Sequence, residues 1–143
     1  MKRFYLSGQN NFGNRGCEAL VRSTLQLLKE KFDQVEVLVP SFRPDLDRKN
    51  WPTAEAEGVK FVRAIDYPSE LIWWGRFQKL FPFLQNLFLP NYSLPKDIES
   101  DLASVDALLL IGGDNITLDY GFGSLIWHAR FAEHAQRLGK PVM

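Results

Sequence analysis

The sequence predicts an α/β fold, a Rossmann-like parallel sheet with helices on both faces. Short apolar stretches that suit buried strands alternate along the chain with amphipathic stretches that suit helices, and this alternation is typical of parallel sheets. The chain has 143 residues, of which 45% are hydrophobic and 24% charged. That length and composition are those of one globular domain, so we expect residues 1–143 to form a single Rossmann-like domain.

The first three elements form a strand, helix, strand unit. Arg3–Ser7 is a short aromatic-rich run ending at a glycine, which predicts a buried strand. After loop 8–16, apolar residues recur at helical spacing and predict an amphipathic helix of about four turns over 17–32. The β-branched run Val35–Val39 predicts the second strand, which we expect Pro40 to end. Such crossovers are parallel and right-handed in nearly all proteins.

The remaining elements follow in order. Polar residues 41–58 include Pro44 and Pro52 and predict a loop with room for one helical turn. The later patterns predict a strand at 59–64, a short helix at 96–104, a strand at 106–111 buried on both faces, and a helix at 121–138. The apolar stripe of that last helix is expected at Phe122, Leu125, Ile126, Ala129 and Ala132, with Gly139 as its stop, after which 140–143 begin a strand with no room to finish.

Residues 71–89 form an aromatic segment. It holds six of the chain's 19 aromatic residues, namely Trp73, Trp74, Phe77, Phe81, Phe83 and Phe88. Interspersed charged, polar and proline residues make it a poor membrane span. Core packing is the favoured interpretation, and contact with a membrane surface or with another subunit through residues 71–89 remains the alternative.

Charge and cysteine content exclude several classes of function. The 17 basic residues balance the 17 acidic ones, and residues 1–70 (11 basic, 10 acidic) and 71–143 (6 basic, 7 acidic) are each nearly neutral. A basic footprint for nucleic acid is therefore missing. Cys17 is the sole cysteine, so one chain cannot form a disulfide or a cysteine zinc site. The start, Met1-Lys2-Arg3, leads into too short an apolar run for a signal peptide. We expect a cytoplasmic protein, with the inner face of the membrane as an alternative place.

The loop between the first strand and helix is rich in glycine and asparagine. Free N–H groups at the helix start, with Arg15, predict a site for phosphate or carboxylate. The candidate binding residues there are Asn10, Asn11, Gly13, Asn14, Arg15 and Gly16. The alternative is a glycine-rich turn whose asparagines cap the helix. Two nucleotide motifs fit poorly: a dinucleotide fingerprint would need glycine at position 11, and a phosphate loop would need Lys at position 14.

Glu18 and Cys17 lie in the first turn of the predicted helix. Glu18 could accept a proton or bind a sugar hydroxyl, although the helix dipole alone also explains an acidic residue there. A helix start can activate a thiol, but a small core residue is the more common role for a cysteine such as Cys17.

A second loop follows the strand at 106–111. Gly112 and Gly113 allow a sharp turn and leave room for a ligand, and Asp114, Asn115 and Asp119 supply oxygens that can hold hydroxyl groups. Asp114 is also a candidate general base, whereas Asp119 could instead cap the next helix.

The two histidines give no metal pair. His128 and His134 are six residues apart on the last predicted helix and so do not share a face, which favours ordinary surface histidines.

Three motifs in order resemble the polysaccharide pyruvyl transferases. They are the run from Asn11 to Leu20 after the first strand, the strand 106–111 entering Gly112-Gly113-Asp114, and the closing run Leu138 to Val142. The resemblance spans nearly the whole chain. It departs from the commoner family pattern at Cys17, where an Asp often precedes the Glu.

The resemblance implies a fold and a reaction. Members look like two-domain GT-B-type transferases that move the enolpyruvyl unit of phosphoenolpyruvate onto two hydroxyls of a glycan or lipid-linked sugar, forming a pyruvate ketal in surface glycan synthesis. It implies that this chain is the amino-terminal half of the cleft, with a carboxy-terminal domain holding the donor, and that phosphoenolpyruvate is a substrate with no further cofactor or metal. Asp114 or Glu18 would be the catalytic base. A nucleotide-sugar glycosyltransferase half and a non-catalytic binding or assembly module are the alternatives.

Overall fold

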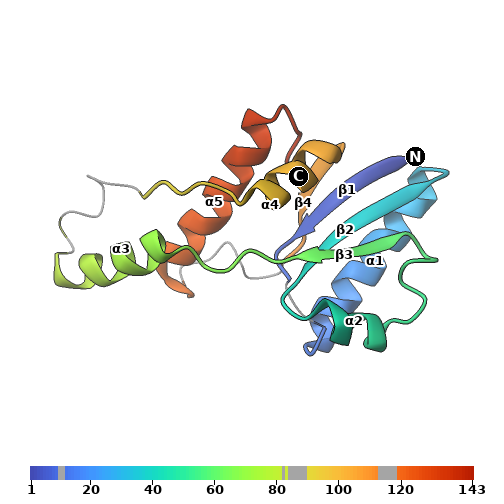
Figure 1. Cartoon of the computed structure of the whole chain (residues 1–143), viewed down its shortest axis with the longest axis horizontal. Helices are drawn as coiled ribbons and strands as arrows, with labels where there is room; N and C mark the ends of the chain where they lie inside the picture. Colours follow the sequence, from blue (N-terminus) through green and yellow to red (C-terminus); the bar gives the residue numbers. More distant parts are fainter. Residues whose placement is uncertain (10–11, 82, 84–89, 113–118) are drawn as a thin grey trace.

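The computed structural model describes residues 1–9, 12–81, 83, 90–112 and 119–143. Within them lies a four-stranded parallel sheet of order β3-β2-β1-β4 (Figure 1). The strands are β1 (Lys2–Ser7), β2 (Val35–Ser41), β3 (Val59–Arg63) and β4 (Ala107–Leu110). The helices are α1 (Arg15–Lys31), α2 (Pro44–Asn50), α3 (Ser69–Leu80), α4 (Lys96–Ser104) and α5 (Gly121–Arg137). The predicted α/β class, a Rossmann-like arrangement, is confirmed.

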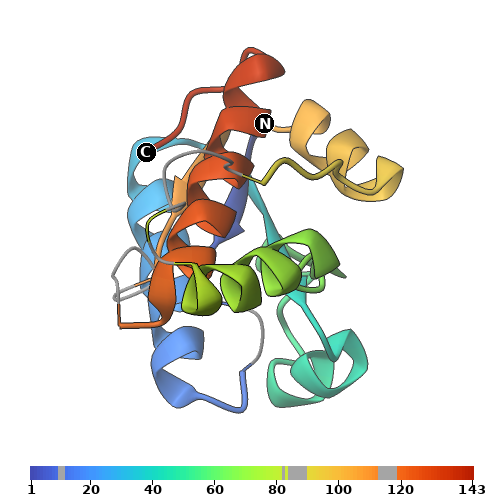
Figure 2. The ribbon, with the colours of Figure 1, turned by 90° about the vertical axis from the view of Figure 1, so that its left-hand side faces the viewer.

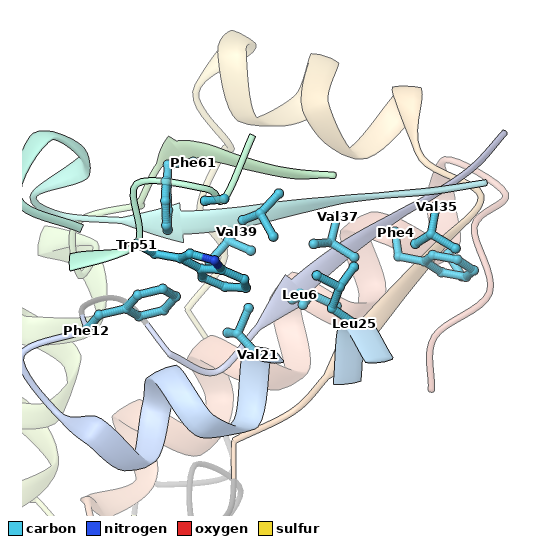
Figure 3. Close-up of a cluster of buried hydrophobic side chains, with 13 residues drawn as sticks. Phe4, Leu6, Phe12, Val21, Leu25, Val35, Val37, Val39, Trp51 and Phe61 are labelled. Atoms are coloured by element: carbon cyan, nitrogen blue, oxygen red, sulfur yellow. The ribbon is translucent and has the colours of Figure 1, made fainter. Parts of the chain in front are cut away.

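One face of the sheet packs against α1 and the α2 region. Alternate residues of the strands meet Val21 and Leu25 of α1 in a buried cluster, because successive strand side chains point to opposite faces. At the carboxyl end of the sheet, Trp51 lies among Phe12, Phe61 and Val21 (Figure 3).

The opposite face packs against α4 and α5. Tyr5, Leu38 and Leu108 of the sheet meet buried residues of α4 and α5. Helix α5 turns Phe131 and Ala135 into this core. The stripe predicted for it is wrong at two positions, since Phe122 and Ala129 are exposed. The buried residues Phe131 and Ala135 are four positions apart, so the helical period was predicted correctly but the face that points to the core was not.

Pro40 does not end the second strand, as the sequence predicted. It lies inside β2 and pairs with Val62 of β3. Val37 donates its N–H to the Gly58 carbonyl on the β3 side, so Pro40, three residues on, turns its nitrogen to the β1 side. Pairing with β1 ends at Leu38, as expected because Pro40 has no N–H with which to extend the ladder on that side.

The segment 41–58 is also more ordered than expected. It contains α2, a seven-residue helix that begins at Pro44, where the lack of an N–H is harmless. Gly58 then enters β3 with a φ of +89°, and a Cβ there would collide with the Val35 carbonyl, so only glycine fits this turn.

The carboxyl-terminal elements follow the predictions closely. Gly139 ends α5 with a φ of +73°, the conformation of a glycine helix stop. Val142 forms an isolated parallel bridge with Leu108, so residues 141–143 lie beside β4. The carboxyl end of β4 is less covered than predicted, because Leu109 and Leu110 are only half-buried.

Core packing is wrong for most described side chains of the aromatic segment. Leu71 is buried, but Trp73, Phe77, Phe81 and Phe83 are exposed. Helix α3 extends from the start of α5 away from the sheet (Figure 1). Viewed from that end, α3 crosses in front of α5 (Figure 2). No helix within the described ranges is both long and apolar enough to cross a membrane.

Candidate functional site

The two predicted loops follow β1 and β4, which are neighbours in the sheet, and both loops begin at the carboxyl end of the sheet. Ser7, the last residue of β1, pairs with Leu110, the last residue of β4, and the Ile111 N–H donates to the Ser7 carbonyl at 2.8 Å. After β1 the chain moves outward through β2 and β3, and it then returns to the other side of β1 to form β4. This is a topological switch point, where parallel α/β sheets most often bind ligands.

The first loop is fixed to the α1 side of the sheet by one aromatic residue and one carboxylate. The Phe12 ring is buried, with centroids 6.1 Å from Trp51 and 5.4 Å from Phe61. The Phe12 N–H donates to Asp47 Oδ1 at 3.1 Å, and the Ser41 hydroxyl donates to Asp47 Oδ2 at 2.6 Å. Sequence reasoning missed Asp47, because an acidic residue in a polar stretch gives no sign that it will be buried.

The start of α1 is capped by the chain itself. Asn14 is the N-cap, and its Oδ1 accepts the Gly16 N–H at 2.9 Å. The Cys17 N–H donates to the Asn14 carbonyl at 3.1 Å. The prediction of free N–H groups is therefore wrong for Gly16 and Cys17, and the capping interpretation is correct for Asn14.

Glu18 is a buried carboxylate held by two arginines. Arg15 Nη1 donates to Oε2 at 2.6 Å and Arg22 Nε donates to Oε1 at 2.9 Å. These contacts, the hydrogen bond from Arg15 foremost, lower the pKa of Glu18 below its ordinary value. Arg22 also stacks over the Trp51 ring, 3.8 Å from its centroid. A carboxylate in this setting orients arginines well, but it is a weak proton acceptor.

The other predicted residues of the first loop lie at the surface or outside the described residues. Gly13, Asn14, Arg15 and Gly16 are exposed. Asn10 and Asn11 lie outside the described residues, so their predicted binding role stays a prediction.

Part of the second loop can also be placed. Gly112 is half-buried just beyond β4, and Asp119 is exposed before α5. The N-cap position of α5 belongs to Tyr120, so Asp119 is not that cap. Gly113, Asp114 and Asn115 lie outside the described residues, and the proposed base Asp114 stays a prediction.

A pocket of about 390 Å³ opens beside the end of β1. Its walls come from the strand end, from the segment after β3 and from the first half of α5. The residues that line it are Ser7, Gly8, Tyr67, Tyr120, Ser124, Trp127 and His128. We call it the switch-point pocket. These residues supply four hydroxyl groups, one indole and one imidazole, and none of them is a lysine or an arginine.

His128 is a functional candidate that sequence reasoning missed. It is half-buried in the pocket wall, and burial lowers the pKa of its imidazole below the ordinary 6.5. The ring is therefore neutral near pH 7 and can both donate and accept a hydrogen bond. The surface interpretation is also wrong for His134, whose Nε2 lies 3.0 Å from the Tyr92 carbonyl oxygen. The spacing of Ser124, Trp127 and His128 on one helix face was the signal available in the sequence.

Gly123 lets Tyr67 form a wall of this pocket. A Cβ added at Gly123 would collide with the Tyr67 hydroxyl oxygen, so the phenol lies directly against the first turn of α5. Partial burial raises the pKa of Tyr67 above its ordinary value, which keeps the hydroxyl protonated as a donor.

Gln9 follows the end of β1 and is almost completely buried, at 2% exposure. Neither its Nε2 nor its Oε1 has a hydrogen-bond partner among the described residues. A buried amide without partners is costly, and its position, two residues after Ser7, brings this unusual group to the switch point.

Comparisons with known proteins identify no relative: no family model, no curated protein and no solved structure matches the chain. Among the described residues, no three His, Cys, Asp or Glu side chains gather as metal ligands.

Proposed function

We propose that this chain supplies the acceptor-binding half of a polysaccharide pyruvyl transferase, with the switch-point pocket as the sugar site. The observation that carries the proposal is the pairing of Ser7 with Leu110, which brings both family-like loops to one edge of the sheet beside that pocket. The resemblance supplies the reaction, and the chemistry of the pocket supplies the choice of substrate.

The lining of the pocket suits a neutral sugar better than an anion. Tyr67, Tyr120 and Ser124 offer hydroxyls that can donate to and accept from sugar hydroxyls. The Trp127 indole offers an apolar face to the C–H groups of a sugar ring. Phosphoenolpyruvate carries a phosphate and a carboxylate and needs cations. No Lys or Arg is among the described residues that line the pocket.

The donor would therefore bind elsewhere. Arg15 is the one cation in the family-like loops, and its largely exposed guanidinium has further N–H donors beyond the one held by Glu18. In this proposal Glu18 orients Arg15 toward a donor anion, and the remaining cations come from the carboxy-terminal domain that the resemblance implies.

His128 is the described group best suited to accept a proton in the pocket. In the proposed reaction, a sugar hydroxyl gives its proton to the neutral imidazole as its oxygen bonds to C2 of phosphoenolpyruvate. In the same step a proton adds to C3 to make the methyl group; phosphate then leaves C2, and the second sugar hydroxyl closes the ketal while its own proton passes to the departing phosphate. Asp114 remains the alternative base.

Sugar binding is the direct test. The chain is titrated with methyl glycosides of galactose, glucose and mannose and followed by saturation-transfer NMR, which detects weak ligands. We expect binding of at least one glycoside that is lost in His128→Ala and kept in the matched control His134→Ala. Binding should hold from pH 8 to pH 6.5 and fall only below that, because burial keeps the pKa of His128 below 6.5.

Two further titrations separate the alternatives. Tight binding of a nucleotide sugar would favour the glycosyltransferase alternative, and binding of none of these ligands would favour a non-catalytic module. Phosphate release from phosphoenolpyruvate and a glycan acceptor by this chain alone would show that the assignment to one half of the cleft is wrong.

A further inference from the structure

The outer surface of α3 carries exposed apolar side chains in a group. Trp73, Phe77 and Leu80 follow one another at spacings of four and three residues, so they share one face of the helix. Phe81 and Phe83 extend this face past the helix end, with ring centroids 5.1 Å apart for Phe77 and Phe81 and 6.2 Å for Phe81 and Phe83. With Ile72, these residues form what we call the α3 patch.

The side chains of the α3 patch are well exposed. Trp73 is 67% exposed, Leu80 75% and Phe83 76%. The opposite face of the helix carries the buried Leu71, which holds α3 against the rest of the molecule. A cluster of large aromatic side chains left outside a core marks an interaction surface.

The charge around the α3 patch indicates what covers it. The acidic residue of α3 is Glu70, in the first turn; from Leu71 to Pro95 the sequence contains no Asp or Glu, and it contains the basic residues Arg76 and Lys79. Arg76 is exposed, and its guanidinium lies 5.4 Å from the centroid of the Trp73 ring. The covering surface must therefore accept aromatic rings and a cation within one turn of helix.

We propose that the α3 patch rests on an anionic lipid bilayer, with α3 lying in the interface. Headgroups with negative charge attract Arg76, while the rings of Trp73 and Phe77 enter the boundary between headgroups and acyl chains, which is where tryptophan is enriched. In a dimer formed through the α3 patch, Arg76 and the acid-free segment 71–95 of one copy would instead face the same groups of the other copy.

The geometry suits a helix that lies on a membrane. Helix α3 has 12 residues and is about 18 Å long, too short to span a bilayer. It projects from the start of α5 with the sheet on the far side, so it can reach a flat surface first (Figure 1). This inference stands apart from the proposed function, because it uses no residue of the switch-point pocket.

Vesicle flotation tests the inference. The chain is mixed with vesicles of phosphatidylcholine alone, or of phosphatidylcholine and phosphatidylglycerol in equal parts, and floated through a density gradient. We expect binding to the mixed vesicles that weakens at high salt, and much weaker binding to phosphatidylcholine alone.

Variants distinguish binding through the α3 patch from nonspecific hydrophobic binding. Trp73→Gln with Phe77→Gln should weaken binding by about tenfold or more, because two rings no longer leave water. The matched control, Leu20→Gln with Leu27→Gln, removes two exposed apolar side chains from α1 and should leave binding unchanged. Leu80→Gln alone, at the exposed helix end, gives a milder loss, and circular dichroism confirms that each variant is folded.

Three results would overturn the inference. The first is that the unaltered chain does not float with anionic vesicles. The second is that the patch variant and the control variant bind these vesicles equally well. The third is that the unaltered chain binds no vesicles but forms a concentration-dependent dimer, which the patch variant does not form. The last would assign the α3 patch to a second copy of the chain.

Discussion

The two helices that follow the switch-point loops begin in opposite ways. At α1 the chain satisfies its own polar groups: Asn14 caps the helix, Glu18 binds two arginines, and Asp47 holds Phe12. At α5 the N-cap residue Tyr120 makes no side-chain capping bond, and side chains of the first two turns line a pocket. The comparison teaches that a glycine-rich loop at a switch point need not line the binding pocket, since here α5 supplies Ser124, Trp127 and His128 to the pocket and α1 supplies none of its described residues.

The first prediction tests whether Phe12 anchors the first loop to the α1 side of the sheet. Phe12→Ala should lower the free energy of unfolding by about 4 kcal/mol, because it removes a buried ring between Trp51 and Phe61. Urea unfolding followed by circular dichroism measures the change. Phe42→Ala, at a position that is half exposed, should cost less than about 1 kcal/mol. Equal losses at the two positions would mean that Phe12 does not anchor the loop.

The second prediction concerns the carboxylate that holds the same loop. Asp47→Ala should cost about 3 kcal/mol, because the Phe12 N–H and the Ser41 hydroxyl lose their acceptor inside the protein. Asp45→Ala, on the same helix but fully at the surface, should change stability by no more than about 0.5 kcal/mol. Urea unfolding measures the stability of both variants. An equally small loss for Asp47→Ala would show that Asp47 does not hold the first loop.

The third prediction uses pH to isolate Glu18. Its lowered pKa means that the carboxylate stabilises the fold above its ordinary pKa of 4.5 and that this contribution disappears as the pH falls through the lower folded value. Glu18→Gln should therefore cost about 1 kcal/mol at pH 7 and progressively less below pH 4.5. Unfolding in urea at several pH values measures the difference. Glu30→Gln, exposed near the other end of α1, is the control, and a loss at Glu18 that does not change with pH would exclude the arginine pair as its cause.

Sequence patterns predicted the sheet and most of the helices, because their signals are local. The period of apolar residues located α1, and the apolar run before Gly112 located β4. Pro40 misled the prediction of β2, since whether a proline is harmless depends on which neighbouring strand its nitrogen faces. That information is in the register of the sheet and not in the strand itself.

The candidate site was less predictable than the fold. The two loops were correctly placed at strand ends, but the groups in them that looked free at α1 are bonded to residues such as Asn14 and Arg22. His128 was overlooked because its neighbours in the pocket, Ser7 and Tyr67, come from distant parts of the chain. Burial and partnership of polar groups are set by long-range packing, which one sequence does not display.

The last prediction compares two glycines that lie in different helices. Beyond its chain neighbours and the backbone of its own helix, Gly75 in α3 has no described heavy atom within 4 Å of an added Cβ, so Gly75→Ala should stabilise the chain by about 0.5–1 kcal/mol through helix propensity alone. Gly123→Ala gains the same propensity in α5, but its Cβ collides with the Tyr67 hydroxyl and must displace the phenol. We expect its stability to change by less than about 1 kcal/mol in either direction.

The two variants should differ more in ligand binding than in stability. Displacing Tyr67 changes one wall of the switch-point pocket, whereas Gly75 lies outside that wall. Saturation-transfer NMR with the methyl glycosides should therefore show weaker binding for Gly123→Ala and unchanged binding for Gly75→Ala. If both variants bind sugar equally well, Tyr67 does not form the sugar site, and the site must be assigned to other residues.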